Sequence, residues 1–159
     1  FLSNAQSGYL PPAVSRWMRE KIWQGYEVQQ GRSRKRIYIS RANAKTRSVL
    51  NEQELLPLLD QYGFEVVRAE ELSYRQQVQL FYDAEAVVAP HGAGLTNLLF
   101  SKQCKVLEFH PADLIKTHYF LLCKGLGFAY TAAIGSAGDR LENYIVNVRQ
   151  VKEWLIENI

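Results

Sequence analysis

The stretch that decides the fold reads Ala86-Val87-Val88-Ala89-Pro90-His91-Gly92-Ala93-Gly94-Leu95-Thr96-Asn97. Its four leading apolar residues are typical of a short buried strand, and the two glycines beyond Pro90 predict a tight turn. A second group of apolar residues predicts a helix that starts directly after the turn. These residues are Leu95, Leu98, Leu99 and Phe100.

The turn between this strand and this helix predicts an anion site. A helix in this position directs its free N–H groups and the positive end of its dipole beyond the strand's carboxyl end. Glycines at Gly92 and Gly94 allow a phosphate to approach the backbone closely. His91 adds a titratable hydrogen-bonding group at the same edge. We therefore expect a phosphorylated ligand here, although the glycines could also serve turn geometry and helix packing alone.

The rest of the chain alternates between strand-like and helix-like segments. Strands are expected over 37–39, 64–67, 86–89, 105–109, 128–131 and 144–148. Helices are expected from Pro12 over about three turns, then over 51–62, 73–81, 95–100, 114–124 and 151–155. Asn51, Ser73 and Asp113 are the expected N-caps of three of these helices. This alternation predicts an α/β fold, a parallel sheet with helices on both faces, in one domain of residues 1–159.

Three side chains fall at the carboxyl ends of expected strands, where α/β sheets bind ligands. They are Arg41, His91 and Glu108. The guanidinium of Arg41 suits bidentate contact with phosphate, and Arg47 is a further candidate unless it forms a local ion pair. Glu108 is an acid in an apolar strand, where it could accept hydrogen bonds from sugar hydroxyls or pair with an arginine.

Composition excludes several classes of function. With 47% hydrophobic residues, the chain of 159 residues can build one core, and its apolar runs are too short for a membrane span. Cys104 and Cys123 form no paired motif, so we expect buried free thiols. No cluster of carboxylates, histidines or cysteines argues for a metal. His110 and His118 lack supporting context and are expected to be surface or structural residues.

Basic residues gather in the first third of the chain. Residues 1–50 contain ten Lys and Arg but only two acids. This asymmetry in charge favours an anionic partner. For Arg32, Arg34 and Lys35 a solvated loop is the favoured interpretation. Nucleic-acid binding through residues 31–36 ranks last, because no aromatic platform or recognised motif accompanies them.

Three segments together carry a resemblance to a known family. They are Ser40-Arg41-Ala42-Asn43-Ala44-Lys45-Thr46-Arg47-Ser48-Val49-Leu50-Asn51-Glu52, Pro90-His91-Gly92-Ala93-Gly94-Leu95-Thr96-Asn97 and Val106-Leu107-Glu108-Phe109. Over residues 36–110 the chain resembles glycosyltransferase family 61. This family includes bacterial capsular-polysaccharide biosynthesis proteins, plant xylan-decorating enzymes and animal O-linked N-acetylglucosaminyltransferases.

The resemblance implies a two-domain GT-B architecture whose C-terminal, Rossmann-like half binds a nucleotide-sugar donor, usually a UDP-sugar. It implies inverting transfer without an obligatory metal or other cofactor. Carried over, Arg41 and Arg47 would contact the donor diphosphate, and Glu108 would lie at the nucleotide end. The turn beneath the donor would consist of His91, Gly92, Ala93, Gly94, Leu95 and Thr96, with His91 as the catalytic candidate.

A two-domain architecture needs a second half for which this chain has no room. The resemblance therefore implies a donor-binding domain of a longer transferase, whose N-terminal domain would hold the general base and much of the groove for a glycan or polysaccharide acceptor. The capsular likeness places it in the cytoplasm of a bacterium or at the inner face of its membrane. The alternative is a non-catalytic Rossmann-like module that binds a phosphorylated ligand.

Overall fold

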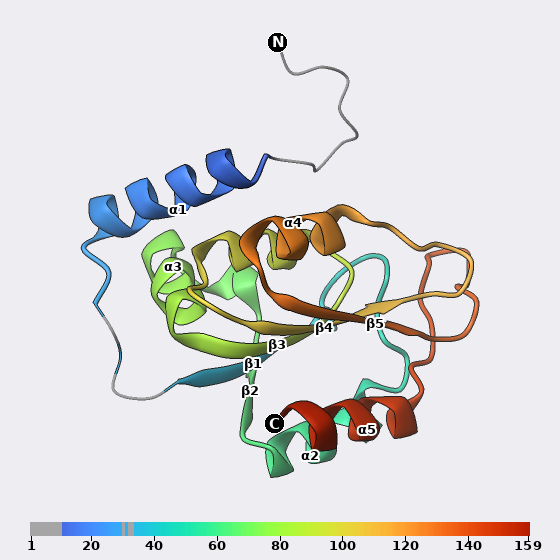
Figure 1. The fold of residues 1–159 in the computed structure, drawn as a ribbon. Helices are drawn as coiled ribbons and strands as arrows, with labels where there is room; N and C mark the ends of the chain where they lie inside the picture. Colours follow the sequence, from blue (N-terminus) through green and yellow to red (C-terminus); the bar gives the residue numbers. More distant parts are fainter. Residues whose placement is uncertain (1–10, 30, 32–33) are drawn as a thin grey trace.

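The computed structural model describes residues 11–29, 31 and 34–159, and its centre is a five-stranded sheet (Figure 1). The strands are β1 (Lys35–Ile39), β2 (Phe64–Val67), β3 (Ala84–Pro90), β4 (Lys105–His110) and β5 (Ala129–Ile134). Their order is β2-β1-β3-β4-β5, and every neighbouring pair is parallel. The predicted α/β fold with a Rossmann-like parallel sheet is confirmed.

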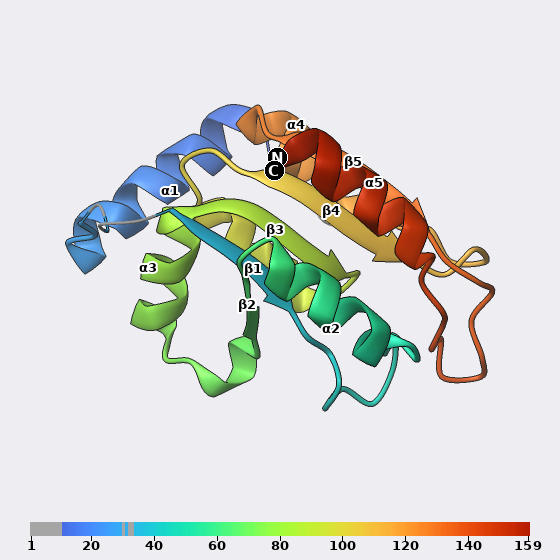
Figure 2. The ribbon, with the colours of Figure 1, turned by 90° about the horizontal axis from the view of Figure 1, so that it is seen from below.

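Helices cover both faces of this sheet, as Figures 1 and 2 show. One face carries α1 (Pro12–Tyr26), α3 (Tyr74–Asp83), the 3₁₀ helix η2 (Ala93–Phe100) and α4 (His118–Leu126). The opposite face carries α2 (Glu52–Gln61) and α5 (Val148–Asn158). A short 3₁₀ turn, η1 (Ala69–Glu71), links β2 to α3. None of the helices in the described residues has the length and apolar character to cross a bilayer.

The core has two halves because successive side chains of a strand point to opposite faces. Ile37 and Ile39 pack with Val87 and Phe81 beneath α3 and η2. Tyr38, between the two isoleucines, packs on the other face under α2 and α5. Both faces of the sheet are therefore buried, as a parallel sheet requires.

The expected strand over 144–148 is wrong. Only an isolated bridge joins Tyr144 to Val49, and the ladder goes no further. The Asn51 side chain takes the place of a partner strand, since it accepts from the Val146 N–H at 2.9 Å and donates to the Val146 carbonyl at 3.0 Å. Asn51 stands at the N-cap of α2, but its side chain does not cap that helix.

The helix expected over 114–124 begins later, at His118. Asp113 caps no helix, because its carboxylate accepts the Gly138 N–H at 2.9 Å and ties the two loops together. By contrast, Ser73 and Gln76 form the predicted capping box at the start of α3. The residues before His118 are consequently a loop at the carboxyl end of β4.

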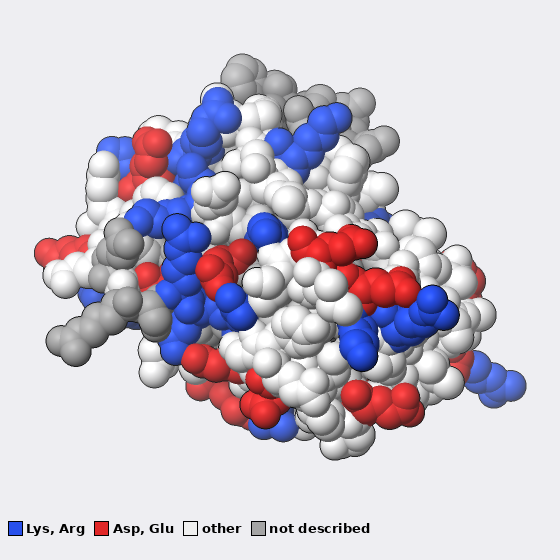
Figure 3. Space-filling view, turned by 60° about the horizontal axis from the view of Figure 1, so that its bottom comes forward, with Lys and Arg blue, Asp and Glu red and all other residues white. Residues whose placement is uncertain are grey.

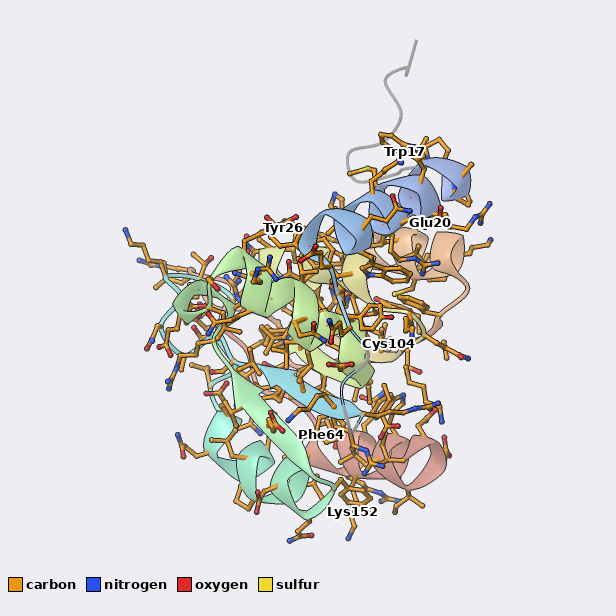
Figure 4. All side chains as sticks on the ribbon, turned by 90° about the vertical axis from the view of Figure 1, so that its left-hand side faces the viewer. Trp17, Glu20, Tyr26, Phe64, Cys104 and Lys152 are labelled. Atoms are coloured by element: carbon orange, nitrogen blue, oxygen red, sulfur yellow. The ribbon has the colours of Figure 1, made fainter. Side chains whose placement is uncertain are left out.

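The side chain of Trp17 projects from α1 into solvent, with 60% of its surface exposed (Figure 4). The helical spacing of Val14, Trp17, Met18 and Ile22 predicts one apolar face for this helix, and the exposed position of Trp17 contradicts its place on that face. Trp23 instead anchors α1, because its indole N–H donates to the Phe100 carbonyl at 2.8 Å. Cys104 and Cys123 are buried free thiols, as expected.

The basic run before β1 is largely neutralised within the fold. Arg36 contacts Glu85 at 2.6 Å, Arg34 lies 3.9 Å from the same carboxylate, and Lys35 pairs with Glu65. Arg32 lies outside the described residues. Figure 3 shows Lys and Arg interspersed with Asp and Glu over the displayed face, an arrangement that differs from a continuous nucleic-acid-binding stripe.

Candidate functional site

The site lies at the point where the strand order reverses. The chain leaves β1, forms β2 on one side of it, and returns to form β3 on the other side. In open parallel sheets the loops that follow such strands diverge and leave a crevice for ligands. Arg41 follows β1 and His91 follows β3, so both predicted residues stand at this crevice.

Behind His91 lies a buried cluster of polar side chains. Nδ1 of His91 is 2.5 Å from Oε1 of Glu108, and the Tyr130 hydroxyl donates to Oε2 of Glu108 at 2.6 Å. Nε2 of His110 lies 3.4 Å from the same Oε2. Glu108 and His110 have no solvent-exposed surface, and His91 is 6% exposed. The Glu108 carboxylate is thus enclosed by protein groups on both oxygens.

Glu108 stays ionised despite its burial. Burial disfavours the charged carboxylate, but hydrogen bonds from His110, His91 and Tyr130 together outweigh this effect and lower its pKa below the ordinary value. The same environment raises the pKa of the Tyr130 hydroxyl well above its ordinary value, through burial and the neighbouring charge of Glu108. Tyr130 is therefore a permanent donor at neutral pH.

A cavity of about 370 Å³ opens beside this cluster, between η2 and α4. Its lining combines basic groups with aromatic, hydroxyl-bearing and aliphatic side chains. Its lining consists of Arg47, His91, Gly92, Ala93, Thr96, Leu99, Lys116, His118, Tyr119 and Leu122. None of these residues is acidic, so the cavity favours an anionic ligand.

Arg41 and Arg47 bring two cations to the same region. Nη2 of Arg41 donates to the Thr46 carbonyl at 2.9 Å, whereas its Nε is buried without a hydrogen-bond partner. Burial and the nearby charge of Arg47 lower the pKa of Arg41. Arg47 has one carboxylate nearby, Glu142, at 3.4 Å. The local ion pair considered for Arg47 is thus present, and Arg47 lines the cavity as well.

Gly92 is required for space. Its φ of 174° is extended backbone that any residue adopts. A Cβ at this position would collide with Nη1 of Arg41, however. A Cβ on Gly94 would lie 3.1 Å from Cγ2 of Ile39 in the core. The first glycine therefore admits a guanidinium, and the second lets η2 pack on β1.

The segment after Gly92 differs from the expected α-helix, because η2 is a 3₁₀ helix. Leu95 points into the core and is 1% exposed, while Ala93 and Thr96 line the cavity. Thr96 Oγ1 lies 3.3 Å from the Tyr119 hydroxyl, which links η2 to α4. Among the predicted turn residues, Leu95 and Gly94 thus pack toward the core and do not line the cavity.

Sequence reasoning missed several residues of the site. His110 could have been found from its spacing, because residues two apart on a strand share a face and Glu108 was already a candidate. His118 and Tyr119 pack against His91 with tilted rings, at centroid distances of 5.8 Å and 5.2 Å, but the expected start of the helix at residue 114 placed neither of them at the site. Tyr130 gave no signal within its own strand.

His91, Glu108 and His110 offer ligand atoms that lie within 4.8 Å of one another, so folding creates a histidine–carboxylate group that spacing along the chain did not indicate. A metal ion could span such a separation. Both oxygens of Glu108 already accept hydrogen bonds from protein side chains. The three residues therefore form a hydrogen-bonded cluster.

The sequence of this chain is similar to known proteins. The family described as Glycosyltransferase 61 matches residues 2–107. Over 66 residues the chain is 42% identical to the EGF domain-specific O-linked N-acetylglucosamine transferase of Drosophila melanogaster. That alignment covers 40% of this chain but only 12% of the Drosophila protein. The chain thus corresponds to a small part of this relative.

Proposed function

Because this chain belongs to glycosyltransferase family 61, we propose that it binds the nucleotide-sugar donor of an inverting sugar transfer, a UDP-sugar. The observation that carries the proposal is the pair Arg41 and Arg47 beside His91, at the crevice of the sheet. The name of the Drosophila relative supports a sugar donor. The family resemblance supports uridine as the nucleoside.

The charges favour a diphosphate. Arg41 is partly desolvated, has a buried Nε without a partner, and lies near a second guanidinium. Like charges held together in a partly buried site destabilise the free protein until an anion joins them. A diphosphate offers several acceptor oxygens, which match the fork of an arginine. Lys116, which lines the cavity together with Arg47, adds a third cation.

In the proposed reaction an acceptor hydroxyl oxygen attacks the anomeric carbon of the donor sugar. The bond from that carbon to the diphosphate oxygen breaks, and its electron pair leaves with UDP. Arg41, Arg47 and the His91 imidazole stabilise the negative charge that develops on the leaving group. These cations supply the charge that a metal supplies in other transferases, so we propose transfer without a metal or cofactor.

The rest of the machinery belongs to other parts of the protein. We propose that this chain is the donor half of a two-domain enzyme, because it aligns with only 12% of its Drosophila relative. An N-terminal domain would supply the general base, which must reach the acceptor hydroxyl, and the groove for a glycan or polysaccharide. From the family resemblance we propose a cytoplasmic location in a bacterium. The relative from Drosophila melanogaster shows that similar sequences also occur in animals.

Isothermal titration calorimetry of the chain with UDP, GDP and CMP tests the proposal. We expect selective binding of UDP, which Arg41→Ala weakens by about 10- to 100-fold, because a charge-assisted contact contributes roughly 1.5–3 kcal/mol. Arg149→Ala is the matched control, since Arg149 lies exposed on α5, where it pairs with Glu153 at 2.9 Å. Equal UDP affinity in wild type and Arg41→Ala would remove Arg41 from the site.

A further inference from the structure

We propose that Glu108 is a positioning residue, which holds the His91 imidazole with its proton on Nδ1 and leaves Nε2 to meet the ligand. The statement about the imidazole rests on the geometry of the contact and on the ionised carboxylate of Glu108. Only the identity of the atom that Nε2 meets, an oxygen of the departing diphosphate, rests on the proposed function. This role differs from the direct contact with the nucleotide that the family resemblance implied for Glu108.

The short contact between His91 and Glu108 determines where the proton lies. Nδ1 of His91 and Oε1 of Glu108 are 2.5 Å apart, and both side chains are buried. An ionised carboxylate only accepts hydrogen bonds, so the hydrogen of this contact must belong to Nδ1. In a neutral imidazole the second nitrogen then has no hydrogen and acts as an acceptor. Free histidine in water prefers the opposite arrangement.

Glu108 is itself held in place and cannot turn toward a ligand without losing its partners. Its Oε2 accepts from the Tyr130 hydroxyl at 2.6 Å and lies 3.4 Å from His110 Nε2. All three residues come from β4 and β5, which are paired in parallel register. Since Glu108 has no exposed surface, ribose hydroxyls would reach its carboxylate only if the protein groups around it moved aside.

Ring contacts fix the plane of the His91 imidazole. His110 stacks on it with centroids 5.3 Å apart and an interplanar angle of 28°. Tyr119 approaches at 5.2 Å from α4. With Nδ1 directed at Glu108 and the ring confined by its neighbours, Nε2 is the nitrogen free to meet a ligand in the cavity that His91 lines.

The consequence for the reaction concerns one hydrogen bond. The neutral Nδ1–H form cannot donate from Nε2, so the contact with a diphosphate oxygen uses the imidazolium, in which Nε2–H donates to that oxygen while Nδ1–H remains with Glu108. The buried carboxylate balances the imidazolium charge. No covalent bond forms on His91, and Glu108 does not touch the donor.

The test is the tautomer of His91, read from two-bond ¹H–¹⁵N NMR spectra of the uniformly labelled chain in mildly alkaline solution. Loss of the signals in His91→Gln assigns them. We expect the wild type to show hydrogen on Nδ1. Hydrogen on Nε2 in the wild type would overturn the proposal whether or not the chain binds UDP, so this measurement is independent of the proposed function.

Two variants distinguish the effect of the Glu108 carboxylate on the tautomer from the effect of disturbed packing in the cluster. Glu108→Leu introduces an apolar side chain of similar size and removes the hydrogen-bond acceptor. We therefore expect the His91 signals to move toward the Nε2–H form. Tyr130→Phe disturbs the same buried cluster and leaves the acceptor, so the Nδ1–H form should persist. A change of tautomer in Tyr130→Phe but not in Glu108→Leu would contradict the assignment. The wild-type spectrum decides alone if Glu108→Leu does not fold.

UDP and uridine binding distinguish the positioning role from direct contact. If Glu108 acts through His91, Glu108→Leu removes the carboxylate that balances the imidazolium, and the contact of His91 with the diphosphate loses its charge assistance. We therefore expect UDP affinity to fall about tenfold and uridine affinity to stay unchanged. An equal loss for uridine would instead show that the carboxylate contacts the ribose, and would overturn the proposal. Failure of the wild type to bind UDP would count against the proposed function only.

Discussion

Replacing Gly92 by alanine should weaken donor binding without unfolding the protein. The new Cβ would overlap Nη1 of Arg41 and lie 3.1 Å from its Cζ and 3.3 Å from its Cδ. Because these atoms belong to the end of a flexible side chain, the guanidinium can swing away. The extended backbone at Gly92 accommodates alanine, so we expect a loss of less than about 1 kcal/mol in the free energy of unfolding.

Binding should respond far more strongly than stability. A displaced Arg41 also loses its 2.9 Å contact with the Thr46 carbonyl, which now fixes its position. The loss of one charge-assisted contact to a phosphate amounts to roughly 1.5–3 kcal/mol, or about 10- to 100-fold in the dissociation constant for UDP. Calorimetric titration with UDP and urea unfolding of the same preparation measure the two quantities side by side.

Gly94→Ala is the matched control, because it adds the same methyl group two residues away. Its Cβ would press on Cγ2 of Ile39 at 3.1 Å, within the core, and would leave Arg41 untouched. We expect this variant to lose stability, by roughly 1 kcal/mol, and to bind UDP like the wild type when folded. Wild-type UDP affinity in Gly92→Ala would refute the idea that Arg41 at this glycine binds the phosphates.

Two further predictions concern stability. Glu108→Gln should lower the free energy of unfolding by roughly 2 kcal/mol at neutral pH. Because folding lowers the pKa of Glu108, its contribution is present above the pKa of the unfolded chain and is lost as pH falls through the folded value, so the deficit should shrink progressively below about pH 4. Urea unfolding from pH 7 to pH 3 measures this, and a deficit independent of pH would contradict it. Asn51→Ala should cost about 1–3 kcal/mol, because both backbone groups of Val146 lose their partner. Its UDP affinity should stay at the wild-type value, and unchanged urea unfolding would show that water replaces the amide.

Much of the architecture could be predicted because strong local patterns agree with the tertiary structure. The apolar run before Pro90 has no polar face, as a strand covered on both sides requires. Arg41, His91 and Glu108 each follow or end such a run, and parallel strands gather these ends at one edge. The convergence of these three residues was therefore implicit in their positions along the chain.

The remaining features depend on partners that are distant in the sequence. The segment after Tyr144 has strand-like composition, but the Asn51 side chain binds its backbone and no strand can pair there. Asp113 has the residue type of a helix N-cap, but its carboxylate accepts a hydrogen bond from the Gly138 N–H and caps no helix. In both cases a single side chain binds the backbone of a segment that is distant in the sequence. Local sequence patterns cannot indicate such a partner.

The position of Arg41 bears on the entropy of ligand capture. A free arginine side chain loses roughly 2 kcal/mol of rotamer entropy when it is immobilised. In this protein the Thr46 carbonyl already holds the guanidinium, in the space that Gly92 leaves open, before any ligand arrives. Most of that ordering therefore accompanies folding, and an incoming diphosphate meets a preorganised receptor. Donor capture should accordingly carry only a small entropic cost for ordering Arg41.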